Sequence, residues 1–347
     1  MHISASDTLT RSVGANREPI QPKSRLWVSK VAIALFAIVI TAAAPSARAQ
    51  ITRFDFPGSI GTSGTAINSA GIVTGVYVTP DQNQHAFLRT ASGALTNIDP
   101  PGTIYAVSYA INSTGDVTGG YEATNQQFFG FLRTASNAYT KFVVPGSFAT
   151  AGWSISPTRA IAGRWLDHSE PQHVHGFLRA PNGSLTSFDF PGSDYTYPSS
   201  INPSDTIVGE YLDSTLTAHA FQRTLDGTIT NIDPPGSTTA VAAAINKSGV
   251  IAGEYDDAAG THGFLLNPDG SYTQFDAPGS VNTNPSSIND VGMVTGYYID
   301  AANAYHAFAR SPAGTFTFGP VLTIPSSINN SGAITGVEGG THGFVRP

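Results

Sequence analysis

Cysteine is absent from this 347-residue chain. Its absence excludes disulfides and thiolate metal ligands, so an exported form has to be held together by packing and strand pairing. Lysine, glutamate and leucine are scarce, and only 12% of the residues are charged. The scarce residues favour helices, whereas the 36 glycines and 23 prolines favour tight turns between strands. The composition therefore predicts an all-β fold.

Long apolar runs are also lacking, with one exception near the N-terminus. Residues 31–44 are almost entirely apolar, Arg25 and Lys30 precede them, and Ala47-Arg48-Ala49 fits a cleavage site. The run is short for a membrane span and is typical of a secretory signal. We therefore expect residues 1–49 to be a signal peptide and Gln50 to begin the mature protein. We expect that protein to be secreted, either extracellular or periplasmic, with no membrane insertion after signal removal.

Basic residues are few once the predicted signal peptide is removed. The whole chain has 17 Lys and Arg against 24 Asp and Glu, and residues 50–347 hold 11 of the former and 22 of the latter. The resulting net charge of −11 repels phosphate backbones, which argues against a nucleic-acid partner.

Internal repetition is what the chain has in abundance. An Ile-Asn pair, or a near form of it, recurs with a pair formed by a small residue and phenylalanine, mostly at steps of 43 to 46 residues. The recurring residues are Ile67, Ile111, Ile155, Ile201, Ile245, Ile288 and Ile328, and Phe87, Phe131, Phe177, Phe221, Phe264, Phe308 and Phe344. A period of this length is typical of a propeller or an array, whose units cannot bury their apolar faces alone.

Each repeat has the pattern of four short antiparallel strands. In residues 62–101, strands are expected at 65–67, 72–77, 85–89 and 95–99, with turn residues between them. The repeat is out of phase at its ends, because residues 51–55 resemble a fourth strand and residues 342–346 a third strand. The pattern predicts a seven-bladed β-propeller over residues 50–347, closed by pairing between these two segments.

A glycine recurs in the second strand of every repeat. These glycines are Gly75, Gly119, Gly163, Gly209, Gly253, Gly296 and Gly336. Because a glycine lets another backbone approach closely, we expect these positions to pack against the neighbouring blade.

The third strand carries a short motif that is similar to a known family. His85-Ala86-Phe87-Leu88-Arg89 and His175-Gly176-Phe177-Leu178-Arg179 resemble the HAF repeat of bacterial extracellular proteins, as do the Phe-Asp-x-Pro-Gly and Ile-Asn-x-x-Gly elements. The resemblance covers nearly all of residues 51–347. It implies export and a bacterial source, and it carries no reaction or catalytic residues with it.

Several recurring polar residues have a structural and a functional interpretation. The third-strand histidines are too far apart in a ring to share a metal, so we expect them to bond to neighbouring turns. The third-strand arginines are expected to pair with a recurring Asp or with turn carbonyls. The Asp of Phe-Asp-x-Pro-Gly is expected to accept backbone N–H groups. The alternative is an acidic ring at one mouth of the channel, attractive to Ca²⁺ or cationic partners.

The third repeat departs most from the common pattern. Arg164-Trp165 replaces the usual Glu-Tyr or Val-Tyr of the second strand, and the following loop contains His168 and His173. Aromatic planes and arginine forks suit sugar rings and carboxylates, so these four residues are our candidate ligand-binding site. The alternative is a longer, polar, solvated loop.

No nucleophile motif, phosphate loop or metalloprotease motif occurs in the sequence. We therefore expect a monomeric, non-enzymatic propeller that binds an extracellular glycan or protein and needs no cofactor. The alternative is a carbohydrate-active enzyme, a glycosidase or polysaccharide lyase, with acidic residues at the channel mouth.

Overall fold

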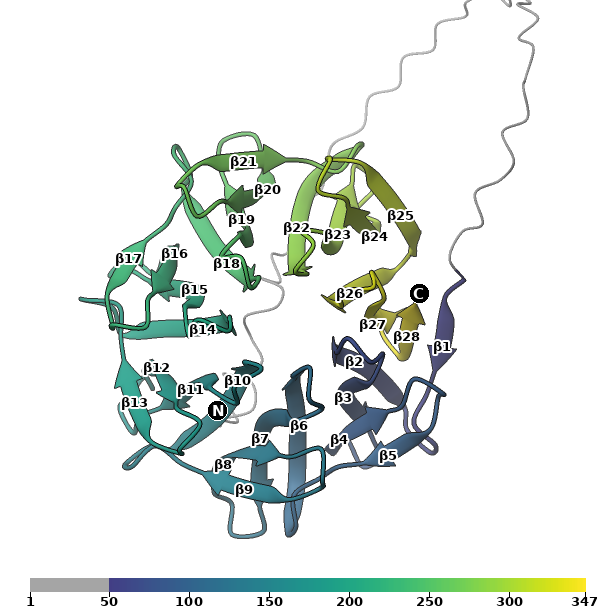
Figure 1. The fold of residues 1–347 in the computed structure, drawn as a ribbon, viewed down its shortest axis with the longest axis vertical. Coiled ribbons are helices and arrows are strands. Elements are labelled where there is room, and N and C mark those ends of the chain that lie inside the picture. Colours follow the sequence, from purple (N-terminus) through teal and green to yellow (C-terminus); the bar gives the residue numbers. More distant parts are fainter. Residues whose placement is uncertain (1–49) are drawn as a thin grey trace, which may run out of the picture. The chain divides into compact units, whose positions relative to one another are not determined.

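The computed structural model describes residues 50–347 as 28 β-strands without a helix. Accordingly, this part of the chain contains no helix that could cross a membrane. The predicted signal peptide and its cleavage motif lie outside the described residues. The all-β prediction is confirmed, and the arrangement of the strands is that of a propeller-like fold (Figure 1).

The strands form repeating antiparallel units of four, which we number in chain order from β2. The innermost strands are β2 (Gly61–Ile67), β6 (Thr103–Ile111), β10 (Ala149–Ile155), β14 (Tyr195–Ile201), β18 (Thr239–Ile245), β22 (Ser280–Ile288) and β26 (Thr323–Ile328). The second strands are β3 (Val73–Val78), β7 (Val117–Ala123), β11 (Ile161–Leu166), β15 (Ile207–Leu212), β19 (Ile251–Asp256), β23 (Val294–Asp300) and β27 (Ile334–Glu338).

The third and fourth strands complete each unit toward the rim. The third strands are β4 (Gln84–Arg89), β8 (Phe128–Arg133), β12 (Val174–Arg179), β16 (Ala218–Arg223), β20 (Thr261–Leu266), β24 (Tyr305–Arg310) and β28 (His342–Arg346). The outer strands are β5 (Leu95–Asn97), β9 (Tyr139–Phe142), β13 (Leu185–Phe188), β17 (Ile229–Asn231), β21 (Tyr272–Phe275), β25 (Phe316–Val321) and, from the start of the chain, β1 (Thr52–Phe54).

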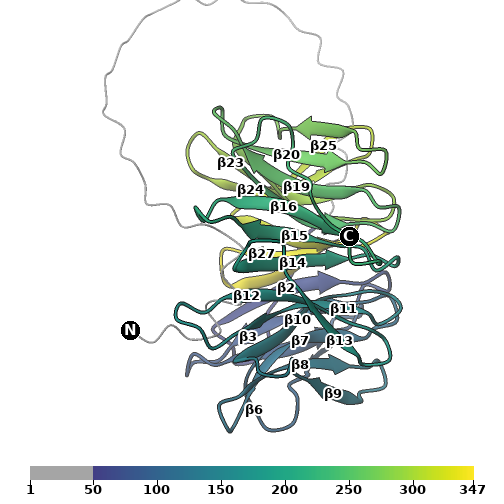
Figure 2. The same ribbon diagram turned by 90° about the vertical axis from the view of Figure 1, so that its left-hand side faces the viewer.

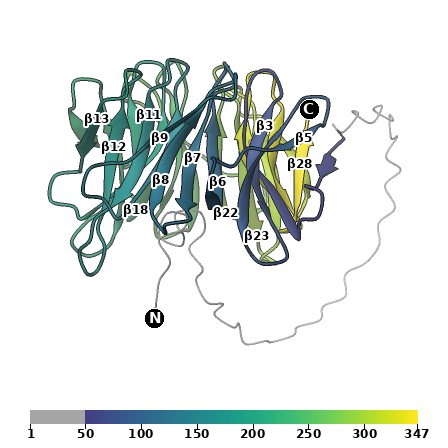
Figure 3. The same ribbon diagram turned by 90° about the horizontal axis from the view of Figure 1, so that it is seen from below.

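The units stand around a common centre, with the inner strands nearest to it and the outer strands at the rim (Figure 1). Side views show neighbouring sheets packed face to face in one layer around the centre (Figures 2 and 3). Single parallel pairings, such as Val174 with Tyr195, connect some neighbouring units. The core lies between the sheets, where the third-strand phenylalanines of the motif are each at most 1% exposed.

The two ends of the described chain pair with each other. Strand β1 runs antiparallel to β28, with Phe54 opposite Gly343 and Thr52 opposite Val345. The Arg53 guanidinium also pairs with the Glu338 carboxylate, with Nη2 2.9 Å from Oε1. This pairing is the one that the out-of-phase repeat predicts.

Asparagine side chains link the inner turns of successive units. Each Nδ2 donates to the backbone carbonyl at the equivalent position of the next unit, as from Asn68 to Asn112 (3.2 Å) and from Asn329 back to Asn68 (2.9 Å). The other bonds of the series are Asn112 to Ser156, Asn202 to Asn246, Asn246 to Asn289 and Asn289 to Asn329. Only Ser156, which lacks an amide, donates no such bond in this series. The recurring Ile-Asn pair therefore fixes neighbouring units to one another.

The recurring second-strand glycine has a different role from the one we expected. A Cβ on Gly253 would meet the Val241 carbonyl oxygen and would lie 2.6 Å from Cε1 of Phe264, both within its own unit. The inner strand has a bulge between Ala242 and Ala244, and its backbone crowds the glycine there. The expectation of contact with a neighbouring blade is therefore wrong, because the close approach occurs inside one sheet.

Candidate active site

One position of the second strand, directly after the recurring glycine, breaks the repeat symmetry. Its occupants in chain order are Val76, Gly120, Arg164, Glu210, Glu254, Tyr297 and Val337. The ionisable residues belong to four consecutive units, because β11, β15, β19 and β23 supply Arg164, Glu210, Glu254 and Tyr297. This position is next to the inner strand and faces the following unit. The four side chains therefore form an arc beside the centre, which we call the polar arc.

Arg164 begins the polar arc and is only 2% exposed. Its guanidinium carbon lies 3.9 Å from the ring centroid of Trp153 and 5.0 Å from that of Tyr197. Its Nε donates to the Pro198 carbonyl at 3.1 Å, across the junction with the next unit. Burial lowers the pKa of Arg164 to about 10, while the negative charge of Glu210 opposes this shift. Arg164 therefore remains a cation at neutral pH, and its charge opposes the rise in the pKa of Glu210.

Glu210 and Glu254 are carboxyl groups at equivalent positions of neighbouring units. Both keep partial contact with solvent although they lie deep beside the inner strands. Burial, helped by the charges of Glu210 and Asp256, raises the pKa of Glu254 to about 8. Burial also raises the pKa of Glu210, but the nearby Arg164 charge opposes this effect. Because the two carboxyl groups interact, their two titration steps belong to the pair and not to either residue alone. The pair holds one proton at neutral pH.

Aromatic rings line the polar arc from Arg164 to Tyr297. Tyr109 stacks on Trp153 with their ring centroids 4.1 Å apart, and Tyr297 lies with its centroid 5.6 Å from that of Tyr305. Burial raises the pKa values of Tyr109 and Tyr297, and it raises that of Tyr197 to about 12. These hydroxyl groups are therefore neutral hydrogen-bonding groups. All five rings retain some exposure. The site thus combines coupled carboxyl groups with flat apolar surfaces.

The structure separates the four residues that the sequence analysis grouped together. Arg164 and Trp165 are consecutive in β11, so their side chains point to opposite faces of the sheet. Arg164 belongs to the polar arc, whereas the Trp165 ring stacks on His175 at 4.1 Å. His168 lies beside Phe148, with ring centroids 5.7 Å apart. Arg164 and Trp165 therefore cannot contact one ligand from the same side of the strand.

His173 lies in a second polar group at the end of the same unit. Its Nδ1 is 3.6 Å from the Asp167 carboxylate, and its Nε2 is 3.9 Å from that of Asp194. The Asp167 carboxylate also accepts bonds from Ser169 and from the His173 backbone, and these bonds lower its pKa to about 2 against the opposing effect of burial. Among residues 50–347, no group of three His, Asp or Glu side chains has the geometry to hold a metal ion.

Five of the six third-strand histidines bond to the recurring Asp after the outer strand, whereas His306, whose unit has Gly319 there, bonds to Asp300. The Nδ1 of His85 lies 2.7 Å from Asp99, and that of His219 lies 2.6 Å from Asp233. Where Phe129 replaces the histidine, Val143 replaces its aspartate. The Asp99 carboxylate also accepts the backbone N–H of Ala86, as expected of a carboxylate before a turn.

This placement corrects the predicted acidic ring. The recurring aspartates directly follow the outer strands, which stand at the rim (Figure 1). They therefore do not surround the channel. The carboxyl groups near the centre are instead Glu210 and Glu254, which the sequence analysis accepted as ordinary members of the repeat. The sequence does contain an indication of this site. The position after the recurring second-strand glycine is occupied by Val, Gly, Arg, Glu or Tyr in different units, although the glycine itself never changes.

No protein-family model matches the sequence, and no curated protein matches it. Solved structures do resemble the fold. A virginiamycin B lyase from Staphylococcus aureus superposes with a TM-score of 0.59 at 15% identity, covering 86% of this chain and 99% of that one. A streptogramin B lyase gives 0.58 at 15% identity, covering 86% and 97%. A puromycin hydrolase gives 0.58 at 12% identity, covering 82% of this chain and 52% of that one.

At these identities, the likeness establishes a shared fold. The expectation of a non-enzymatic binding module is nevertheless corrected, because these similar structures are a lyase and a hydrolase by name. The sequence alternative of an enzyme agrees better with these comparisons and with the coupled carboxyl groups.

Proposed function

We propose that the protein is an extracellular enzyme that cleaves glycosidic bonds, with Glu254 as the general acid and Glu210 as the general base. The observation that carries the proposal is the coupled carboxyl pair beside Arg164. Glycosidases use two carboxyl groups in opposite protonation states, and their environments set those states. Here burial, helped by the Glu210 charge, raises the pKa of Glu254 and keeps its proton in place, whereas the Arg164 charge opposes the effect of burial on the pKa of Glu210.

The chemistry follows from these two states. Glu254 donates its proton to the glycosidic oxygen as the bond to the anomeric carbon breaks. Glu210 accepts a proton from the water that attacks this carbon. Trp153 and Tyr109 provide stacked apolar faces for sugar rings beside Arg164, at the start of the polar arc. The remaining tyrosine hydroxyl groups stay protonated and donate hydrogen bonds to sugar oxygens.

The proposal includes the architecture that brings these units together. A seven-bladed propeller closed by β1 places the polar arc at the inner edge of four adjacent blades. Pairing of β1 with β28 and the Asn329-to-Asn68 hydrogen bond both support closure. The predicted signal peptide at residues 1–49 and the resemblance to HAF repeats support the extracellular location in this proposal.

The test is the release of reducing ends from a panel of neutral and acidic polysaccharides by the purified protein. On the substrate that is cleaved, Glu254→Gln and Glu210→Gln should each lower kcat/KM by about 10²–10⁴-fold. Glu122→Gln, a half-buried carboxyl of β7 outside the polar arc, is the matched control and should retain activity. Activity should fall as the pH rises through about 8, because Glu254 then loses its proton.

The products distinguish a hydrolase from a lyase. A hydrolase forms only saturated ends, whereas a lyase leaves an ultraviolet-absorbing unsaturated sugar. Full activity in both glutamine variants would overturn the assignment of the acid and the base. Lack of cleavage across the panel would overturn the proposal for glycosidic bonds.

A further inference from the structure

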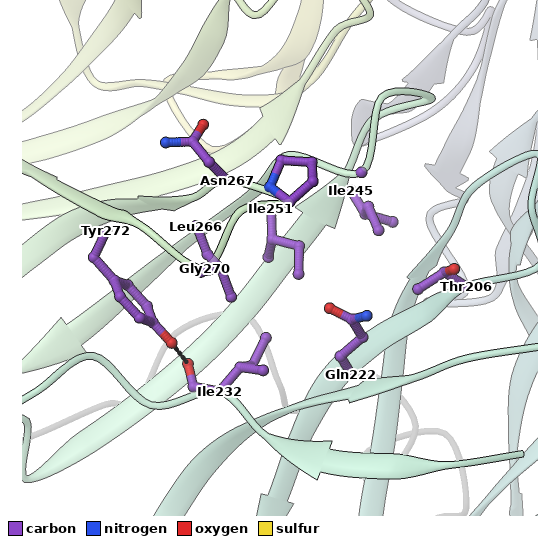
Figure 4. A pocket seen from close by; sticks show the side chains of 11 residues that line it. Thr206, Gln222, Ile232, Ile245, Ile251, Leu266, Asn267, Gly270 and Tyr272 are labelled. Carbon is purple, nitrogen blue, oxygen red and sulfur yellow. Dashed lines mark hydrogen bonds between the residues drawn. The ribbon is translucent and has the colours of Figure 1, made fainter.

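A cavity of about 370 Å³ lies between units 4 and 5, away from the polar arc. It opens beside the turn that follows β18 and the turn between β20 and β21, whereas the long loops of the units lie at the other end of the strands. Its walls include the aliphatic side chains of Ile232, Ile245, Ile251 and Leu266 (Figure 4). This volume falls in the range of small-molecule sites.

The cavity exists because one residue departs from the repeat. Leu266 occupies the third-strand position that holds Arg89, Arg133, Arg179, Arg223, Arg310 and Arg346 in the other units. In four of those units, the guanidinium covers the outer-strand phenylalanine of the preceding unit, at 4.7 to 5.3 Å from the ring centroid. Leu266 is too short to reach across in this way.

The space beside the glycine of the following turn shows that unit 5 lacks the arginine side chain. A Cβ on Gly93, Gly183, Gly227 or Gly314 would lie 3.3 to 3.5 Å from Nη2 of the local arginine. A Cβ on the equivalent Gly270 would meet nothing within 4 Å. The space that the arginine fills in those units is therefore open in unit 5.

A second departure supplies a polar group to the same cavity. Gln222 of β16 stands where other third strands have Leu88, Leu132, Leu178 and Leu265. Its amide makes no hydrogen bond to any group of residues 50–347, and Thr206 lies on the same side of the cavity (Figure 4). Opposite them, the Tyr272 hydroxyl donates to the Ile232 carbonyl at 3.0 Å and keeps its acceptor capacity.

We infer that this cavity binds a small, uncharged, largely apolar molecule that carries one hydroxyl or carbonyl group. No charged side chain lines the cavity, so a charged ligand would lose its hydration without compensation. The aliphatic walls bind the apolar body of the ligand, and the Gln222 amide bonds to its polar group. The inference is independent of the proposed catalysis, because it concerns other residues at another place in the fold.

The repeat itself provides the test variants. Leu266→Arg restores the arginine of the other units and should fill the cavity, and Gln222→Leu restores the leucine. The probes are 4-bromophenol and bromobenzene, measured by calorimetric titration against the purified protein. Leu266→Arg should weaken both probes at least tenfold. Gln222→Leu should weaken 4-bromophenol about tenfold and change bromobenzene less than twofold, because only the phenol loses a hydrogen bond. Leu265→Met, in the same strand but outside the cavity, is the control.

A crystal soaked with 4-bromophenol provides a measurement that does not depend on the folding of a variant. Bromine should appear among Ile232, Ile251 and Leu266. Bromine elsewhere, no binding of either probe by the parent protein, or binding by folded Leu266→Arg within twofold of the parent would overturn the inference.

Discussion

The ring of Phe54 occupies the space that a side chain on Gly343 would need. A Cβ on Gly343 would lie 2.6 Å from Cε2 of Phe54, although the two residues belong to opposite ends of the chain. The same relationship joins Gly130 to Phe142, Gly176 to Phe188 and Gly263 to Phe275. Where Ile98 or Ile232 follows the outer strand instead, the third strand has Ala86 or Ala220. In these six units, the pair therefore keeps its total volume nearly constant, as a close-packed core requires.

This relationship predicts that Gly343→Ala destabilises the protein and that Phe54→Ile relieves the effect. The added methyl group should cost about 1–3 kcal/mol of unfolding free energy, because the phenylalanine ring has to move. In the double variant, the alanine–isoleucine pair of units 1 and 4 is recreated. Urea unfolding of the parent, both single variants and the double variant gives the coupling energy. Strictly additive effects would show that the two side chains do not share this space.

The replacement Gly253→Val should destabilise the protein by at least about 2 kcal/mol, which is within the range of overpacking. The branched side chain would meet the Val241 carbonyl and the Phe264 ring inside its own sheet. Thr273→Val, an exposed strand position of the same unit, is the control and should change stability by less than about 0.5 kcal/mol. A loss below that value at Gly253 would show that the bulged backbone yields.

Removal of residues 50–58 should lower the stability of the whole domain in one cooperative transition. The deletion exposes one edge of β28, removes the Phe54 ring and removes Asp55, the partner of His342. Arg53→Ala is the control, because it removes the ion pair of exposed Arg53 with buried Glu338 and leaves β1 and Phe54 in place. The measurement is thermal unfolding followed by calorimetry. Unfolding of the truncated protein at the parent temperature would contradict closure by β1.

Glu254→Gln should change the pH dependence of stability. The pKa of Glu254 is raised from 4.5 to about 8 in the folded state, so the folded protein binds the proton more tightly than the unfolded chain does. This contribution to stability is complete below pH 4.5 and is lost as the pH rises toward 8. The parent should therefore lose up to about 1.4 kcal/mol per pH unit in this window relative to the variant.

Urea unfolding of both proteins at pH 5, 6.5 and 8 provides the measurement. Asp269→Asn, in an exposed turn where hydrogen bonds from Ser271 lower the carboxyl pKa, should run parallel to the parent over this range. A Glu254→Gln curve parallel to the parent would show that Glu254 is ionised throughout and cannot serve as the proposed acid.

Local chemistry allowed much of the fold to be predicted from sequence. Alternating side chains, Asn and Gly turns and the regular period are properties of short segments, and they predicted four strands per repeat. The pairing of His85 with the turn at Asp99 is local too, since only 14 positions separate them. The candidate site is harder to predict from sequence, because Arg164 departs from the repeat whereas Glu210 and Glu254 match its Glu-Tyr pattern.

The strand content, the repeat and the phase that brings Phe54 to Gly343 follow from the order of residues along the chain. Which side chains meet across neighbouring units depends on the three-dimensional packing of the sheets. Arg164 and Trp165 lie on opposite faces of β11, and the packing of neighbouring units brings Glu210 and Glu254 close enough for their titrations to be coupled. The same packing makes Leu266 the wall of a cavity. The physical reason is that desolvation, charge coupling and unfilled volume depend on what a neighbouring sheet contributes, and residues about 44 positions away supply that neighbour.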